Sequence, residues 1–145
     1  MKAKDYLKQI ELLDVKIKHR KEQVEEMRRK AAGINGSGIN PDKVQTSAKG
    51  DIMSQTIASY IDLQSDIINL IAELDKQKNE AISRIHRLTN SRYVNLLYKH
   101  YVEYKSLDKI ANEMNYSYDH IKHMHVDALN IFAKVNNDIL EEHTE

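Results

Sequence analysis

Residues 106–129 read Ser-Leu-Asp-Lys-Ile-Ala-Asn-Glu-Met-Asn-Tyr-Ser-Tyr-Asp-His-Ile-Lys-His-Met-His-Val-Asp-Ala-Leu. Apolar residues recur three and four positions apart, first from 107 to 114 and again from 121 to 129, which places each set on one face of a helix. Ser106 and Ser117 stand before these two runs, where a serine oxygen accepts a hydrogen bond from an unpaired backbone N–H. The stretch therefore predicts two short helices joined by a tight turn.

The small side chain of Ala111 lies on the apolar face of the first predicted helix. A small residue is needed where two helices cross closely. This arrangement is typical of a helix-turn-helix, whose second helix enters the major groove of DNA.

The composition favours a helical protein with a large solvated surface. Of 145 residues, 30% are charged, and the chain contains one proline and no cysteine or tryptophan. Without cysteine there is no disulfide framework and no thiolate metal site. The apolar runs are too short to cross a membrane, and the first residues lack the apolar core of a signal peptide. We expect a cytoplasmic protein that does not associate with membranes.

The positions of glycine and proline predict how the chain is organised. All four glycines and the proline lie between Gly33 and Gly50, which predicts a single long loop over 33–50. A second break is expected near 88–91, where Thr, Asn and Ser can end one helix and cap the next. We therefore predict an all-α fold with an antiparallel helical hairpin (1–88), a helix-turn-helix domain (89–135) and an acidic tail (136–145).

Both predicted hairpin helices, 3–32 and 51–88, carry a narrow apolar seam with heptad spacing. Such seams are typical of coiled-coil packing. Because a narrow seam buries little by itself, we expect the C-terminal domain, a second subunit or both to complete it. The residues assigned to oligomerisation are Ile10, Leu13, Ile17, Val24, Ile67, Ile71 and Leu74.

Charge is distributed unevenly although the formal net charge is zero. Residues 1–50 carry a net charge of +5, residues 51–88 carry −2, and residues 89–145 carry −3. Strong non-specific DNA binding needs Lys and Arg to neutralise phosphates, so the proposed DNA-reading part is weakly charged for that task. A basic cluster in the first helix is either its solvated face or an extra set of phosphate contacts: Lys16, Lys18, Arg20, Lys21, Arg28, Arg29 and Lys30.

The sequence offers no convincing catalytic or cofactor site. His120 and His123 could share a helix face and His100 could lie nearby, but His125 points elsewhere and no carboxylate completes a ligand set. We interpret these histidines as exposed, mostly neutral side chains. The glycine-rich loop lacks the Gly-Lys-Ser/Thr ending of a phosphate-binding loop. We expect no enzyme activity, no metal and no cofactor.

From Arg92 onward the chain resembles the fourth conserved region of sigma factors and its phage relatives. The matching residues are 98–102, 106–114, 116–118, 121 and 124–129, which read YKHYV, SLDKIANEM, YSY, I and MHVDAL. The whole chain, including Asp42–Ser47 in the loop, is also similar to phage and prophage late-transcription regulators of the RinA and ArpU type. This resemblance implies binding to promoter DNA and activation of late phage genes in a bacterial host, with RNA polymerase as a partner.

The residues expected to face double-stranded DNA lie mainly at the start of the second predicted helix, because that end of a recognition helix usually contacts bases. Only Lys122 among them is a permanent cation. Ser106 and Ser117 are candidates because backbone N–H groups at helix starts can meet phosphates, and Lys105 and Lys109 are weaker phosphate candidates. The proposed base-facing set is Tyr118, Asp119, His120, Lys122 and His123.

A single helix-turn-helix module with little positive charge rarely binds DNA well alone. We therefore predict a homo-oligomer that binds repeated or palindromic sites. Two other functions remain open. A small terminase subunit, which initiates phage DNA packaging, also joins a helix-turn-helix to oligomerising helices. Alternatively, the domain binds RNA polymerase or a regulator through a neutral surface rather than DNA.

Overall fold

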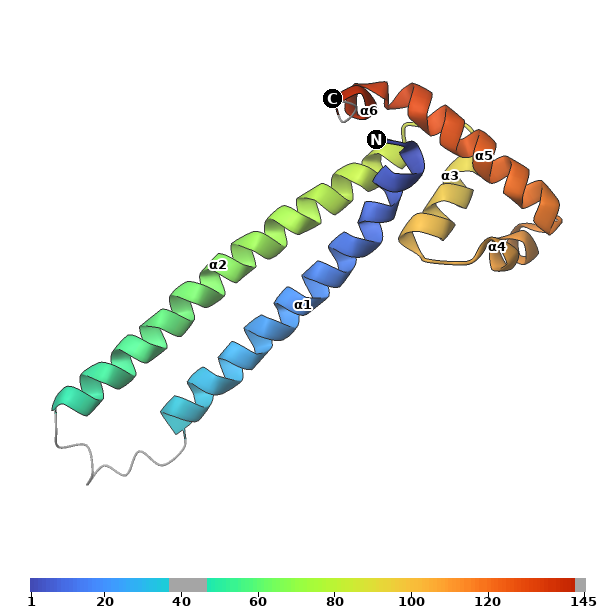
Figure 1. Ribbon diagram of the computed structural model, residues 1–145. Helices are drawn as coiled ribbons and strands as arrows, with labels where there is room; N and C mark the ends of the chain where they lie inside the picture. Colours follow the sequence, from blue (N-terminus) through green and yellow to red (C-terminus); the bar gives the residue numbers. More distant parts are fainter. Residues whose placement is uncertain (37–46, 143–145) are drawn as a thin grey trace. The chain divides into compact units, whose positions relative to one another are not determined.

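The structure of this protein is a computed structural model that describes residues 1–36 and 47–142, with side chains described at 1–33 and 54–140. Every regular element in those ranges is helical, which confirms the predicted all-α fold. One turn, η2, is a π-helix, in which the Glu103 N–H donates to the Tyr98 carbonyl. The elements are α1 (Ala3–Gly36), α2 (Ser47–Ile85), α3 (Ser91–Leu97), η2 (Tyr98–Val102), α4 (Leu107–Met114), α5 (Tyr118–Val135) and α6 (Asn137–Glu142) (Figure 1).

Both long helices extend into the segment that the sequence predicts to be a loop. Helix α1 continues through Gly36 and α2 begins at Ser47, so both ends of the predicted 33–50 loop are helical. Glycine lowers helix stability without forbidding it, and a helix already held by packing can absorb that loss. Residues 37–46 lie outside the described residues, as does most of the Asp42–Ser47 segment.

The chain divides into two compact units, one of residues 16–75 and the other of residues 1–15 together with the chain from 76 onward. In the first unit, α1 and α2 run antiparallel side by side (Figure 1). Ile17 and Val24 of α1 and Ile67 and Leu74 of α2 are buried, as the heptad seam predicts. This unit contains most of the residues of the predicted helical hairpin.

The second unit has a core to which both ends of the chain contribute. Leu7 and Ile10 from α1 are buried in one cluster with Ile85, Leu97 and Phe132, and the exposed fraction of each is zero. Burying one such side chain contributes about 1.5–3 kcal/mol to the free energy of unfolding. The predicted boundary at residue 88 therefore cuts through a continuous core, because the base of the hairpin packs directly on α3 and α5.

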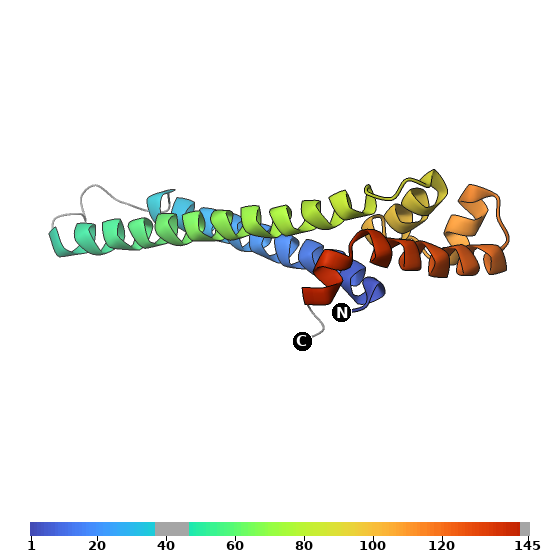
Figure 2. The same cartoon turned by 90° about the horizontal axis from the view of Figure 1, so that it is seen from above.

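The sequence predicts an acidic tail from residue 136, but the segment up to Glu142 is a helical part of this unit. Figure 2 shows α6 turning away from the end of α5 beside the start of α1. Asn136 is fully buried at this corner, and its Nδ2 donates to the carbonyls of Phe132 (3.1 Å) and Arg84 (3.2 Å). A buried amide with both donors satisfied fixes the direction of the chain.

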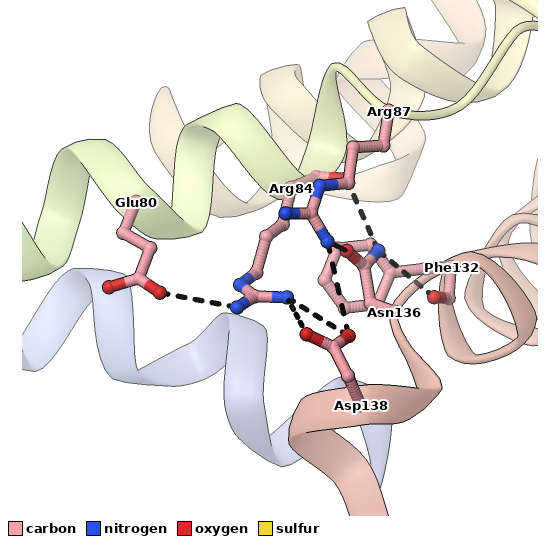
Figure 3. A network of polar contacts seen from close by, with 6 residues as sticks. All are labelled: Glu80, Arg84, Arg87, Phe132, Asn136 and Asp138. Carbon is pink, nitrogen blue, oxygen red and sulfur yellow. Dashed lines mark hydrogen bonds and ion pairs between the residues drawn. The ribbon is translucent and has the colours of Figure 1, made fainter.

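An arginine of α2 holds α6 in place (Figure 3). Arg84 is 8% exposed, and its guanidinium donates to both carboxylate oxygens of Asp138 at 3.3 Å and to Glu80 at 3.2 Å. Arg87 donates to the side-chain oxygen of Asn136 at 3.2 Å. Asp138, which the sequence analysis assigned to the tail, therefore anchors α6 through a charge-assisted contact.

A second polar contact ties the loop after η2 to α1. Tyr104 has a left-handed backbone (φ 59°), and its hydroxyl donates to Asp14. Asp14 also accepts from Lys78 at 2.6 Å. Because a left-handed conformation is unfavourable for a tyrosine, the contacts around it must stabilise this geometry. Within the described residues, no helix is long and apolar enough to cross a membrane.

Candidate nucleic-acid interface

The turn between α4 and α5 has the geometry that its sequence predicts. Ser106 accepts a hydrogen bond from the Lys109 N–H at 3.2 Å, and Ser117 accepts one from the His120 N–H at 3.1 Å. Both predicted N-caps are confirmed. Between the helices, Asn115 adopts a left-handed conformation (φ 59°), which asparagine tolerates better than most residues and which ends α4.

A small apolar cluster fixes the packing of these two helices. Ile110 and Ala111 of α4 are buried with Ile121 and Met124 of α5 and with Leu96 of α3. The exposed fraction of Ala111 is 2%, in keeping with the predicted close helix contact. With this face of α5 buried, the opposite side of its first turns faces solvent.

All five residues predicted to face DNA are exposed on that outer side of α5: Tyr118, Asp119, His120, Lys122 and His123. The Lys122 ammonium lies 5.0 Å from the centroid of the Tyr118 ring, within range of a cation–π contact. This contact orders a long, flexible side chain next to a hydrogen-bonding hydroxyl. The surface can thus present one cation together with imidazole, phenol and carboxylate groups.

Arg92 is a further cation beside this surface that the sequence analysis did not select. Its guanidinium carbon lies 6.0 Å from the centroid of the Tyr116 ring, and that ring packs on His120 with centroids 4.8 Å apart. Arg92 is exposed near the start of α3, which Asn90 caps by accepting from the Arg92 N–H at 3.0 Å. Only tertiary packing brings α3 to α5, so helical periodicity gave no signal for this residue.

Lys105, a predicted phosphate contact, is instead held by two carboxylates. Its ammonium lies 2.8 Å from Glu103 and 3.0 Å from Glu113, and Glu113 also binds Lys99 at 2.9 Å. Hydrogen bonds from Lys99 and Lys105 lower the pKa of Glu113, so this carboxylate remains charged at neutral pH. Lys109, the other predicted phosphate contact, is exposed.

The expectation that the clustered histidines are all exposed is wrong for His125, which is buried, and for His100, which is half-buried. His125 is 8% exposed, its Nε2 lies 2.8 Å from the Tyr101 hydroxyl, and the His100 ring centroid is 5.1 Å away. Burial, helped by nearby His100, lowers the pKa of His125 to about 4. Burial also raises the pKa of Tyr101 to about 12. Both groups are therefore neutral at pH 7, and the pair is structural.

Most of the residues assigned to oligomerisation are already covered within one chain. Ile10, Ile17, Val24, Ile67 and Leu74 are buried, whereas Leu13 and Ile71 are half-buried. The two seams face each other in the hairpin, so their apolar surface is used there. If the chain self-associates through its helices, it must do so mainly through other side chains.

The basic cluster of α1 lies mostly on solvent-exposed positions of the 16–75 unit. Arg28 lies 3.7 Å from Glu25, and Lys30 lies 3.3 Å from Glu26. Such exposed pairs one helical turn apart contribute little to stability and leave the side chains able to rearrange. Arg28 and Lys30 therefore remain exposed on the surface of this unit.

Neither a cluster of metal ligands in the described residues nor a similarity to known proteins adds a further assignment. Among residues 1–36 and 47–142, no three His, Asp or Glu side chains are arranged to hold a metal ion. No family model, no curated protein and no solved structure matches this chain.

Proposed function

We propose that this protein is a DNA-binding transcription regulator that reads double-stranded DNA with the first turns of α5. The observation that carries the proposal is the exposed face of Tyr118–His123, which follows a serine-capped turn and lies opposite the face buried against α3 and α4. A helix supported in this manner can enter a major groove while its neighbours contact the backbone.

The side chains on this face have complementary roles in base reading. Lys122 can donate to guanine O6 and N7, Asp119 can accept from a cytosine amino group, and His120 can hydrogen-bond at a base edge. His123 and Tyr118 extend the same surface. The combination favours sequence discrimination over strong electrostatic attraction.

Contacts to the DNA backbone come from the edge of the surface. Arg92 and Lys109 are exposed cations on α3 and α4, and the N-terminal ends of α4 and α5 at Ser106 and Ser117 can offer backbone N–H groups to phosphates. Few phosphates would be neutralised, so one copy binds weakly and with a shallow salt dependence. A homo-oligomer on repeated half-sites compensates for this weakness.

The resemblance to sigma-factor region 4 favours promoter DNA as the target. It also favours activation of late phage or prophage genes, with RNA polymerase as a partner in the bacterial cytoplasm.

The experiment begins with selection of bound fragments from host and prophage genomes, followed by footprinting. On the selected fragment, Lys122→Ala should weaken binding by about 1–3 kcal/mol if Lys122 reads a base. Lys134→Ala is the matched control, because Lys134 is an exposed lysine in the last turn of the same helix. If the Lys122→Ala variant and the unmodified protein bind the fragment with equal affinity, Lys122 is not one of the base-reading residues.

A second function is favoured by the ion pairs around Glu113. They neutralise Lys99 and Lys105 on η2 and the loop that precedes α4, as expected of a domain that binds another protein instead of nucleic acid. Absence of binding to any phage DNA at low salt, together with stable capture of purified RNA polymerase, would select this function.

A further inference from the structure

A groove between α1 and α2 in the 16–75 unit has hydrogen-bond donors on one wall and leucines on the other. We propose that this groove binds a small, soluble phosphate monoester, a ligand that joins one phosphate group to an apolar body. The groove has a volume of about 320 Å³, which is at the small end of sites for small molecules. Its lining consists of Lys16, His19, Arg20 and Gln23 from α1 and of Leu70 and Leu74 from α2.

The four α1 residues of the groove lie on one side of the helix. His19, Arg20 and Gln23 follow Lys16 by three, four and seven positions, and these spacings bring side chains together on a helix surface. Among residues 1–33 and 54–140, no carboxylate forms an ion pair with Lys16, His19 or Arg20. This wall therefore carries positive charge without an acidic partner in the described part of the chain.

Arg20 occupies a position that a coiled coil usually gives to an apolar residue. It lies three residues after Ile17 and four before Val24, which are both buried, and Arg20 itself is half-buried. Half-buried Lys78 of α2, by contrast, has a carboxylate partner, because Asp14 lies 2.6 Å from its ammonium. Removing a cation from water without pairing it is unfavourable, so Arg20 gains stability from a bound anion.

The polar groups of the groove are mainly donors. The Arg20 Nη1 donates to the side-chain oxygen of Gln23 at 3.1 Å, which uses the acceptor of that amide and leaves its NH₂ group. Lys16 adds an ammonium and His19 adds a ring N–H, and the Arg20 guanidinium has further N–H groups. A complementary ligand must therefore supply several acceptor atoms together with negative charge.

A phosphate monoester is better suited to this wall than a carboxylate is. It carries a charge of about −1.5 to −2 at pH 7 and three acceptor oxygens. A guanidinium can bind two of these oxygens side by side, and the third remains for a lysine or an amide. A carboxylate offers a single charge and two oxygens. On the opposite wall, Leu70 is 38% exposed and Leu74 is 8% exposed, so the body attached to the phosphate meets apolar surface.

The charge of α2 favours a small ligand over a strand of nucleic acid. Residues 54–75 contain four carboxylates and neither lysine nor arginine. Two of these carboxylates, on Asp66 and Glu73, are exposed about one turn before and one turn after Leu70. A strand with a phosphate at every nucleotide would bring some of its charges close to them, whereas a monoester presents a single phosphate to α1. The inference does not depend on DNA binding by α5.

The first test is calorimetric titration of the full-length chain with phenyl phosphate, a monoester with an apolar ring. Arg20→Gln should weaken binding by about 10-fold or more, because the guanidinium supplies both charge and paired donors. Arg29→Gln is the matched control, because Arg29 is an exposed arginine of the same helix that does not line the groove. Its affinity should stay within about 2-fold of that of the unmodified chain. No saturable binding at millimolar concentration, or equal weakening in both variants, would overturn the proposal.

A second variant tests the apolar wall. Leu70→Ala should weaken binding of phenyl phosphate by about 3-fold or more and leave binding of inorganic phosphate unchanged, because only the first ligand has an apolar body. Circular dichroism checks that every variant keeps its helices. Equal weakening of the two phosphates, or no weakening of either, would contradict a ligand body that rests on Leu70.

A DNA arm separates this ligand class from the proposed function. A duplex that the protein binds should not displace phenyl phosphate, and Arg20→Gln should bind that duplex as well as Arg29→Gln does. Displacement by the duplex, together with weaker duplex binding by Arg20→Gln alone, would assign the groove to the DNA backbone and overturn the small-ligand site.

Discussion

His125 lies on the buried side of α5, where its Nε2 atom is 2.8 Å from the Tyr101 hydroxyl. With the imidazole neutral, the tyrosine O–H can donate to Nε2 while the hydroxyl oxygen remains shielded from water. Protonation would place a positive charge away from water in this buried site and close to His100, so burial first and His100 second lower the pKa of His125 to about 4. The residue is therefore a pH-sensitive element of the core rather than a contact to DNA.

We predict that His125 makes the protein less stable in mild acid. Its folded-state pKa lies below its unfolded value, so its contribution to stability is fully present above pH 6.5 and is lost as the pH falls toward 4. By pH 4 the loss should reach about 2–3 kcal/mol of unfolding free energy. Denaturant unfolding from pH 7 to pH 4 measures the slope of unfolding free energy against pH, both for the unmodified chain and for the His125→Gln variant. The variant should fold because the glutamine oxygen can still accept a hydrogen bond from Tyr101. Equal slopes in the two proteins would contradict the prediction.

Helix α4 affects how much free positive charge lies near the proposed DNA-reading face of α5. Glu113 in its last turn binds Lys99 of η2 and Lys105 of the following loop, so one carboxylate restrains two ammonium groups. Besides the net charge of −3 over residues 89–145, these ion pairs restrain two of the lysines in that segment. If the protein binds DNA as proposed, these contacts reduce the number of lysines that are free to meet phosphates.

Replacing Glu113 with glutamine should strengthen non-specific DNA binding. Lys99 would lose its anionic partner and Lys105 would keep only Glu103, and each lysine that then contacts a phosphate should make the slope of log affinity against log salt steeper by about 0.9. Fluorescence anisotropy with a random-sequence duplex over a salt series measures this slope. Asp127→Asn, an equal change of charge at an exposed position of α5, is the control. A slope that changes equally in both variants would mean that total charge, rather than the Glu113 pairs, governs binding.

The sequence predicted the elements of the C-terminal half better than the boundaries of the units. Ser106 and Ser117 could be identified as caps because capping is local, and Ile121 could be assigned to the core because it follows helical periodicity. The burial of His125 and the position of Arg92 depend on how α5 packs against η2 and α3, which periodicity within one helix does not specify. Leu7 fell outside the predicted seam and yet is fully buried, because its surroundings come from the far end of the chain.

At the scale of the molecule, the candidate DNA-reading helices belong to a unit that includes both the first 15 residues and the chain from 76 onward. Leu7 and Ile10 share a core with Phe132 of α5, whereas Ile121 and Met124 belong to the cluster under α4. The first turns of α1 therefore support the same helix that is proposed to read DNA.

Deletion of residues 1–15 should lower the stability of α5 even though no predicted DNA contact is removed. Loss of Leu7 and Ile10 alone leaves cavities beside Phe132 and Ile85, and each such loss typically costs about 2–5 kcal/mol. Thermal unfolding by circular dichroism and amide hydrogen exchange of α5 measure the effect. Leu12→Ala, at a 53% exposed position of the same segment, serves as the control and should change little. Unchanged protection of α5 in the deletion would show that residues 76–142 form their core alone.

The core shared by Leu7 and Phe132 also affects how the chain is made. A ribosome adds about 5–20 residues per second, so the first turns of α1 emerge roughly 6–25 s before the residues that cover them. During that interval the nascent chain can form the 16–75 hairpin, but Leu7 and Ile10 remain without their partners from α5. Translation that stops before Phe132 would release a chain with exposed apolar side chains, which is a substrate for chaperones and proteases. Synthesis of α5 therefore supplies the apolar cover that Leu7 and Ile10 lack until then.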